Sequence, residues 1–209
     1  MRRPGAPAVA TALAAGLVGG AGTLVALMAR GRLTLDTGWG RSITPLRPRT
    51  VRFEASREQV FDYLAAPYLG RTPAAMRDHL RVWERSEDLV IASHFSELAG
   101  YTAETVEAVH FERPSRITFR HLRGPVPHAV ESFELTEEDG GTRLEYAGEV
   151  GLDWWFAGRA AAKWWVVPTW DRVVAASLAS SKDGVEALAA RRRARTTEGD
   201  QAATATNDA

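Results

Sequence analysis

The sequence predicts an α+β domain in which one curved antiparallel sheet closes over a long C-terminal helix. Three observations predict it: a strand-like alternation followed by a helix signature at residues 51–67, a run of strands with turn residues between them over residues 80–152, and an Ala-, Trp-, Val- and Leu-rich segment over residues 153–195. A sheet in this order can bury one face by curling around the final helix. Such curling leaves space for an apolar cavity between the two.

Each element has its own local signal. Ser56-x-x-Gln59 is a capping-box pattern that opens a helix, and Pro67 is expected to close it. Asp139-Gly140-Gly141 is a hairpin turn, because glycine tolerates positive φ. Pro168 removes one backbone donor from the last helix and should kink or restart it. The strands are expected over residues 51–55, 80–85, 89–98, 101–112, 116–123, 126–137 and 142–152.

Composition excludes several classes of protein. Of the 209 residues, 45% are hydrophobic and 25% charged, which allows a packed core. Residues 1–50 carry seven Arg against one Asp, whereas residues 51–190 carry 15 basic and 22 acidic groups. A net-acidic body argues against a nucleic-acid partner, because phosphate binding needs clustered positive charge. The absence of Cys excludes disulfides, thiolate metal sites and Cys nucleophiles.

The N-terminus predicts a membrane anchor. Residues 7–29 contain no charge, and as a helix they would span roughly 35 Å, enough for a hydrocarbon core of about 30 Å. A cleaved signal peptide, with a site near Gly19-Gly20-Ala21, and a buried helix are the alternatives. Gly16 and Gly20 form a small-xxx-small pair that could join two copies into a homodimer.

Four segments follow from these patterns: a transmembrane anchor over 1–29, a juxtamembrane linker over 30–49, the folded domain over 50–195, and a disordered polar tail over 196–209. The expected location is the cell membrane, with a single pass. More Arg residues follow the apolar run than precede it, which favours a cytoplasmic domain.

Strand alternation places three polar residues on otherwise apolar faces. His121 follows Phe119 at a spacing of two, Glu131 precedes Phe133 in the same way, and Tyr146 lies among apolar residues of the last strand. In a cavity these three polar residues, together with Phe119 and Phe133, could bind a ligand and orient its oxygen atoms. The polar residues could also act as acid and base. The alternative is structural: Glu131 and His121 pair with each other or with a nearby Arg, or a bulge turns one of them outward.

Tryptophan is concentrated in the closing segment, with five of the seven between residues 153 and 171. At about 100° per residue Trp154 and Trp165 share one face, and they are candidate ligand-binding residues. Core packing and contact with a membrane interface are the alternatives for this segment.

The chain resembles the START/polyketide cyclase-like superfamily, also called SRPBCC or helix-grip proteins. The resemblance covers residues 50–190 and rests on VRFEASREQVFDYLAAP, FERPSRITFRHLRGPVP, FELTEEDGGTRLEYAGEV and the Trp-rich last helix. It implies a helix-grip fold with a hydrophobic-ligand cavity. Members bind lipids, sterols, polyketides or aromatic hormones, and a minority catalyse cyclisation or dehydration.

These observations favour a membrane-anchored domain that binds or transports a hydrophobic ligand such as a lipid, polyketide or isoprenoid. A cyclase or dehydrase using His121, Glu131 and Tyr146 is one alternative, and a cell-envelope interaction module is another. No metal or cofactor is expected, because the sequence has no His-x-His, His-Glu-x-x-His or phosphate-loop spacing. A Gly-x-Ser-x-Gly elbow is also absent.

Overall fold

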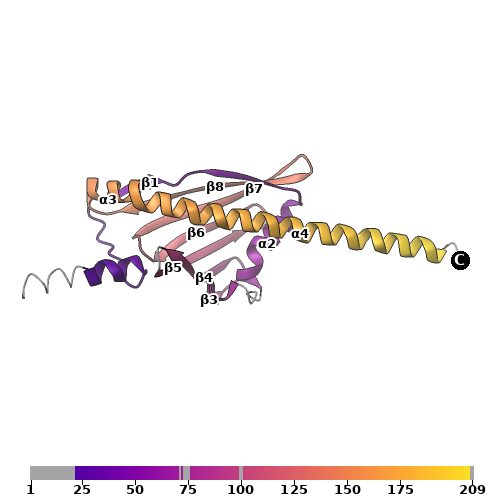
Figure 1. Cartoon of the computed structure of the whole chain (residues 1–209), viewed down its shortest axis with the longest axis horizontal. Helices are drawn as coiled ribbons and strands as arrows, with labels where there is room; N and C mark the ends of the chain where they lie inside the picture. The colour runs from indigo at the N-terminus through magenta and orange to yellow at the C-terminus, as the bar shows by residue number, and fades with distance from the viewer. Residues whose placement is uncertain (1–21, 71, 73–75, 99–100, 208–209) are drawn as a thin grey trace, which may run out of the picture.

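The computed structural model describes residues 22–70, 72, 76–98 and 101–207, and its centre is one antiparallel sheet of eight strands (Figure 1). The strands follow the order β1-β8-β7-β6-β5-β4-β3, and β2 also pairs with β8. Their bounds are β1 Ser42–Pro45, β2 Arg49–Phe53, β3 Leu80–Arg85, β4 Leu89–Leu98, β5 Tyr101–Glu112, β6 Arg116–Arg123, β7 His128–Glu138 and β8 Gly141–Leu152. The helical elements are α2 Arg57–Leu69, α3 Trp155–Ala161, the π-helical turn η2 Ala162–Val166, and α4 Val167–Asn207.

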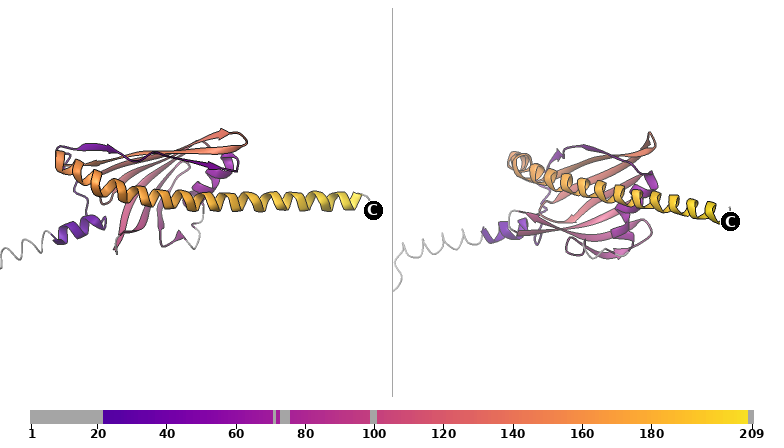
Figure 2. Two further views of the ribbon diagram at one scale, coloured as in Figure 1. Left: turned by 45° about the horizontal axis from the view of Figure 1, so that its top comes forward. Right: turned by 45° about the vertical axis from the view of Figure 1, so that its right-hand side comes forward.

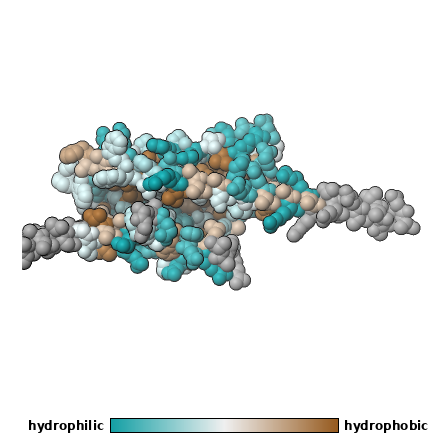
Figure 3. All heavy atoms as spheres, viewed as in Figure 1, coloured by the Kyte–Doolittle hydropathy of each residue, from teal (hydrophilic) through white to brown (hydrophobic). Residues whose placement is uncertain are grey.

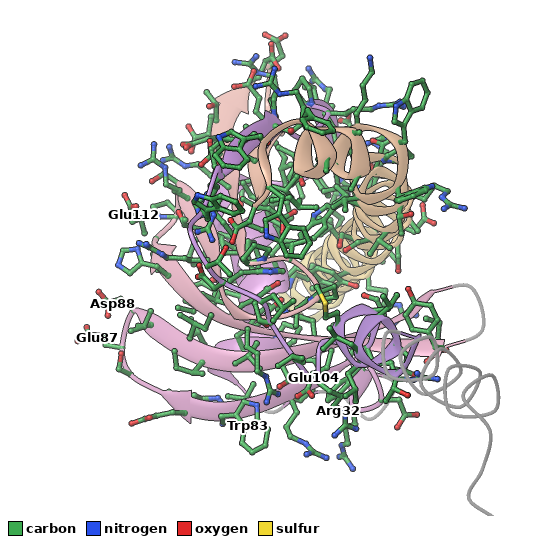
Figure 4. The ribbon with its side chains drawn as sticks, turned by 90° about the vertical axis from the view of Figure 1, so that its left-hand side faces the viewer. Arg32, Trp83, Glu87, Asp88, Glu104 and Glu112 are labelled. Carbon is green, nitrogen blue, oxygen red and sulfur yellow. The ribbon has the colours of Figure 1, made fainter. Side chains whose placement is uncertain are left out.

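The sheet curls around α4, as the sequence predicted (Figures 1, 2 and 4). Val174, Leu178, Val185 and Ala189 of α4 are buried at helical spacing in the same core as inward residues of the sheet. A Cβ at Gly184 would collide with the hydroxyl of Tyr63 in α2, so the glycine allows these two helices to pack closely.

The alternation of buried and exposed side chains along β8 matches the prediction. Leu144, Tyr146 and Val150 are buried, whereas Glu145 between them is exposed. The strand pairs with β7 along its whole length, from Gly141 to Gly151, and with β1 and β2 on its other edge. β8 and β7 thus lie side by side near one edge of the sheet, and the Trp170 indole of α4 reaches Glu131 of β7.

The helix α2 begins as predicted and ends later. Both hydrogen bonds of the capping box between Ser56 and Gln59 are present. Pro67 lies inside the last turn, and the helix ends at Gly70 instead. A proline near the end of a helix removes only one backbone bond, so the remaining turn can still form.

The last helix is interrupted just before Pro168, in agreement with the predicted kink or restart. The five residues before α4 form the π-helical turn η2, and Pro168 then falls in the first turn of α4, where its missing N–H costs least. The helix continues to Asn207, so the expectation of a disordered tail over 196–209 was wrong for the described part of that segment. Low hydrophobicity there argued against a buried core, but a helix can form without contributing to one.

The predicted linker over 30–49 is also partly ordered, because β1 and the start of β2 lie in it and pair with β8. Residues 22–29 are helical. Within the described residues no helix is long and apolar enough to cross a membrane. Most of the predicted anchor, residues 7–21 with Gly16 and Gly20, lies outside the described residues.

Candidate functional site

The concave side of the sheet carries a cluster of polar side chains that faces α4. Adjacent strands each contribute one member, because residues at inward positions of neighbouring strands meet across the sheet. Register pairs Glu107 with His121 and Phe133 with Tyr146. The polar members, called the inner network below, are Tyr68, His94, Glu107, His121, Glu131, Tyr146 and Trp170.

Glu107 is the centre of one half of the inner network. Its Oε2 lies 2.7 Å from Nδ1 of His94, and its Oε1 lies 2.8 Å from Nε2 of His121. Nε2 of His94 is in turn 2.8 Å from the hydroxyl of Tyr68 in α2. The side chain of His121 is only 2% exposed, and within the described residues its Nδ1 has no hydrogen-bond partner. This His121 ring can therefore accept or donate one more bond.

Glu131 is the centre of the other half. The hydroxyl of Tyr146 donates to Oε1 of Glu131 over 2.5 Å, and the indole N–H of Trp170 donates to the same oxygen over 2.8 Å. Trp170 comes from α4, so this bond links the helix to the sheet. Its ring also lies 5.1 Å from the ring of His121.

The two carboxyl groups of the network have opposite pKa shifts. Burial alone would raise the pKa of Glu107, but the charges and hydrogen bonds of His94 and His121 outweigh it and lower the pKa well below its usual range. The same pairing raises the pKa of His94, although burial opposes it. Both shifts favour the charged forms, so Glu107 and His94 form a buried ion pair.

Burial raises the pKa of Glu131, and the nearby charge of Glu107 raises it further, against the hydrogen bonds of Tyr146 and Trp170. Burial also raises the pKa of Tyr146 and of Tyr68, so both phenols stay protonated and can donate hydrogen bonds. An anionic carboxylate thus lies beside a carboxyl group that tends to hold its proton.

Aromatic rings border the network. The ring centres of Phe119 and Phe133 lie 5.2 Å apart, and those of Phe133 and Tyr146 lie 5.9 Å apart. Phe119, Phe133 and Trp170 are only partly buried, and the His94 side chain is 23% exposed, although all four lie between sheet and helices. Partial exposure of side chains from both layers indicates that solvent reaches between them. Hydrophobic residues are visible in recesses between hydrophilic ones on this side of the molecule (Figure 3).

Among the described residues, Glu107, His121 and Glu131 bring ligand-type atoms within 4.8 Å of one another, a grouping that the sequence analysis did not predict. Hydrogen bonds and ion pairs within the network already engage both oxygens of Glu107 and one of Glu131. Only the short distances between these atoms suggest a metal. The hydrogen bonds and ion pairs of the inner network explain the same distances.

The structure brings together five of the seven predicted site residues, namely Phe119, His121, Glu131, Phe133 and Tyr146. The predicted structural pair of Glu131 with His121 does not form. His121 lies beside the carboxylate of Glu107 instead, and Glu131 accepts a hydrogen bond from Tyr146.

The other two predicted site residues lie elsewhere. Trp154 is 46% exposed and Trp165 is 74% exposed, on the α3–η2 segment rather than beneath α4. The indole that enters the site is that of Trp170. The prediction assumed one continuous helix, whereas a left-handed turn at Trp154 and the π turn change which face points inward.

Four members of the network were not predicted: Tyr68, His94, Glu107 and Trp170. Glu107 had a usable signal, since it alternates in phase with the buried Val109 and Phe111. His94 had the same kind of signal, since it alternates in phase with the buried Val90 and Ala92 of β4.

Comparisons with known proteins agree on the fold. No protein-family model and no curated protein matches the sequence. Among solved structures, the di-domain ARO/CYC BexL from the BE-7585A biosynthetic pathway aligns with a TM-score of 0.58 at 21% identity, covering 69% of this chain and 50% of that one. Norcoclaurine synthase from Thalictrum flavum aligns with a TM-score of 0.55 at 9% identity, covering 71% and 87%. A START superfamily protein from Mycobacterium smegmatis aligns with a TM-score of 0.50 at 14% identity, covering 68% and 97%.

The chain spans about half the length of the di-domain protein. At these identities the likeness concerns the backbone, and the expected curved sheet with its long C-terminal helix is confirmed. The chain has the helix-grip fold that these START and aromatase/cyclase structures share.

Proposed function

We propose that the domain binds a mainly apolar ligand carrying oxygen functions in the space between the sheet and α4. The observation that carries this proposal is the combination of partly exposed aromatic side chains from both layers with the inner network beside them. Aromatic rings supply apolar contact area, and a few placed polar groups orient the ligand, as is usual for small-molecule sites. The fold shared with aromatase/cyclase and START structures supports the same ligand class.

The probe for this proposal is emodin, a flat anthraquinone with hydroxyl and carbonyl groups. We expect emodin to quench the fluorescence of the full chain with saturable binding, and Phe133→Ala to weaken binding about tenfold, since losing one aromatic contact costs about 1.5 kcal/mol. Trp83→Ala, on the exposed side of β3, is the matched aromatic control and should bind like the parent chain. Equal affinity of Phe133→Ala and the parent, or no saturable binding, would contradict the proposal.

A second candidate is proton-transfer catalysis on such a ligand. It is favoured by the opposite pKa shifts of Glu107 and Glu131 on either side of His121, because paired groups with separated pKa values often act as acid and base. With 2-tetralone as the probe, the ionised fraction of Glu131 would take a C1 proton to leave the enolate, exchange that proton with D2O as the carboxylic acid, and return a deuteron to C1. We expect NMR to show exchange at least about a hundredfold faster than in Glu131→Gln, the usual size of general-base catalysis. Equal exchange in both would exclude this role.

We further propose that the chain is held at the cell membrane by residues 7–29, with the domain on the cytoplasmic side. The support is the uncharged run of 23 residues and the Arg residues that bracket it. Its test is a nitroxide label at Val18→Cys, which is part of the experiment in the next subsection.

A further inference from the structure

Five large aromatic side chains are exposed at one end of the domain, and we call them the aromatic face: Trp39, Trp155, Phe156, Trp164 and Trp165. Their exposed fractions run from 52% for Trp155 to 83% for Phe156. Large apolar patches of this kind mark interaction sites on soluble domains. None of the five contributes to the inner network.

The backbone that presents the aromatic face is strained and firmly held. Trp154 and Trp155 both have positive φ, at 70° and 45°, which is rare for bulky residues. Their N–H groups donate to the carbonyls of Trp39 and Gly40 over 2.9 and 2.8 Å. Strain of this kind persists only where surrounding contacts enforce it, and it concentrates at functional sites.

Asp153 is the buried anchor of this turn. Its carboxylate accepts from the backbone N–H groups of Thr37 and Gly38, from the Thr37 hydroxyl and from the Arg41 guanidinium. The segment before β1 is thereby tied to the start of α3. At Gly40, φ is 62° and a Cβ would collide with the ring of Trp155, so only glycine lets the ring sit there. The aromatic side chains are thus exposed by a rigid structure.

Basic side chains accompany these rings. A shallow groove of about 670 Å³ runs between β1 and the α3–η2 segment, and Phe156, Trp164, Arg159 and Lys163 line it. The ammonium of Lys163 lies 5.3 Å from the centre of the Trp164 ring. Exposed Trp together with Arg and Lys is the composition of protein surfaces at the headgroup level of a bilayer, where indole is favoured and cations meet anionic lipid.

The position of the aromatic face within the domain also favours contact with a bilayer. The helical residues 22–29 lie at the same end of the domain as α3 in all three ribbon views (Figures 1 and 2). Leu24, Val25 and Leu27 of that helix are exposed, and they form the end of the uncharged run over 7–29. A chain anchored through that run would bring this end of the domain to the lipid surface.

We propose that the aromatic face lies in the interfacial region of an anionic bilayer, so that the domain docks on the membrane through α3 and η2. This docking goes beyond the proposed ligand site, which lies beneath α4. It fixes the orientation of the domain, with the far end of α4 pointing away from the lipid (Figure 2).

The chain has no Cys, so single-Cys variants carry one spin label each. We would label Phe156→Cys and Trp165→Cys on the aromatic face, Trp83→Cys on β3 as an exposed-aromatic control, and Val18→Cys in the predicted anchor. The full chain is reconstituted in vesicles of phosphatidylcholine with phosphatidylglycerol, and collision rates with oxygen and with a water-soluble nickel complex are measured by electron paramagnetic resonance.

At positions 156 and 165 we expect the nickel collision rate to fall at least about threefold relative to position 83, as for side chains buried in the headgroup region. Replacing Trp164 with Glu in the labelled Phe156→Cys chain should restore the nickel rate, because a charge is costly at that depth. Circular dichroism of each variant, unchanged from the parent, shows that the domain remains folded.

Equal nickel rates at positions 156, 165 and 83 would overturn the docking proposal. A loss of collisions that appears without lipid and grows with protein concentration would also overturn it, because a second copy would then cover the face. Position 18 reports separately: high oxygen and low nickel rates there support the anchor, and water-like rates refute the anchor while the labels at 156 and 165 still report on the aromatic face.

Discussion

Replacing Glu107 with Leu is expected to lower the free energy of unfolding by about 4 kcal/mol, because removing one partner of a buried ion pair leaves the others without compensation. His94 loses the acceptor of its Nδ1, and His121 loses the carboxylate that lies 2.8 Å from its Nε2. Chemical denaturation of the full chain measures the change. Glu112→Gln, on the exposed side of the same strand, is the control and should change stability by less than about 0.5 kcal/mol.

The loss should depend on pH in a defined direction. His94 has a raised pKa in the fold, so its contribution is complete below its ordinary pKa of 6.5 and disappears as the pH rises through the raised value. Glu107 has a lowered pKa, so its contribution is complete above its ordinary 4.5 and disappears as the pH falls. Glu131, with a raised pKa, also favours the fold at the acidic end of that window. The Glu107→Leu effect should therefore be largest near pH 5–6.

A double variant gives the sharper control. Buried ion pairs replaced as a whole by apolar residues often cost little, so His94→Leu combined with Glu107→Leu should lose less than the two single changes added together. An additive result, or an effect of Glu107→Leu that does not vary between pH 5 and pH 9, would show that the pair is not formed in the folded chain.

Replacing Asp153 with Ala is expected to cost about 3 kcal/mol, because two backbone N–H groups and a guanidinium lose their acceptor in a buried position. For a domain of this size that lowers Tm by roughly 5–10 °C. Burial acts to raise the pKa of Asp153, but the bonds from Arg41 and Thr37 prevail and lower it to about 2. Its contribution is therefore retained down to pH 4 and lost only below.

The matched control for Asp153 is Asp139→Asn. Asp139 lies in the β7–β8 hairpin with φ of 49°, its side chain is 85% exposed, and Asn tolerates that backbone conformation. Its Tm should stay within about 1 °C of the parent chain. Equal Tm values for Asp153→Ala and Asp139→Asn would mean that the carboxylate of Asp153 does not hold the start of α3.

Most of the fold is readable from the sequence because its signals are local. Period-two alternation and turn residues give the bounds of β3, β4, β5 and β6 directly, and Ser56 with Gln59 gives the start of α2. Strand β1 was missed because its four residues form a strand only through pairing with β8. The helical tail was missed because low hydrophobicity argues against a core and not against a helix.

The site was predictable only in part for a related reason. Alternation within one strand identifies inward polar residues, and it found His121, Glu131 and Tyr146. The partner of each residue depends on register between strands and on the helix phase after the π turn. Glu107 and Trp170 therefore appear as the partners only once the sheet and α4 are in place.

The 41 residues of α4 make a rod of about 60 Å at 1.5 Å per residue, and much of its C-terminal part extends past the sheet (Figure 1). A single unsupported helix keeps its shape only marginally in water, so this overhang should fray and be cut by proteases before the rest of the domain. The same overhang projects from the domain as a single helix. The overhang places Asn207 tens of ångströms from the turn at Asp153 and away from the interior of the sheet.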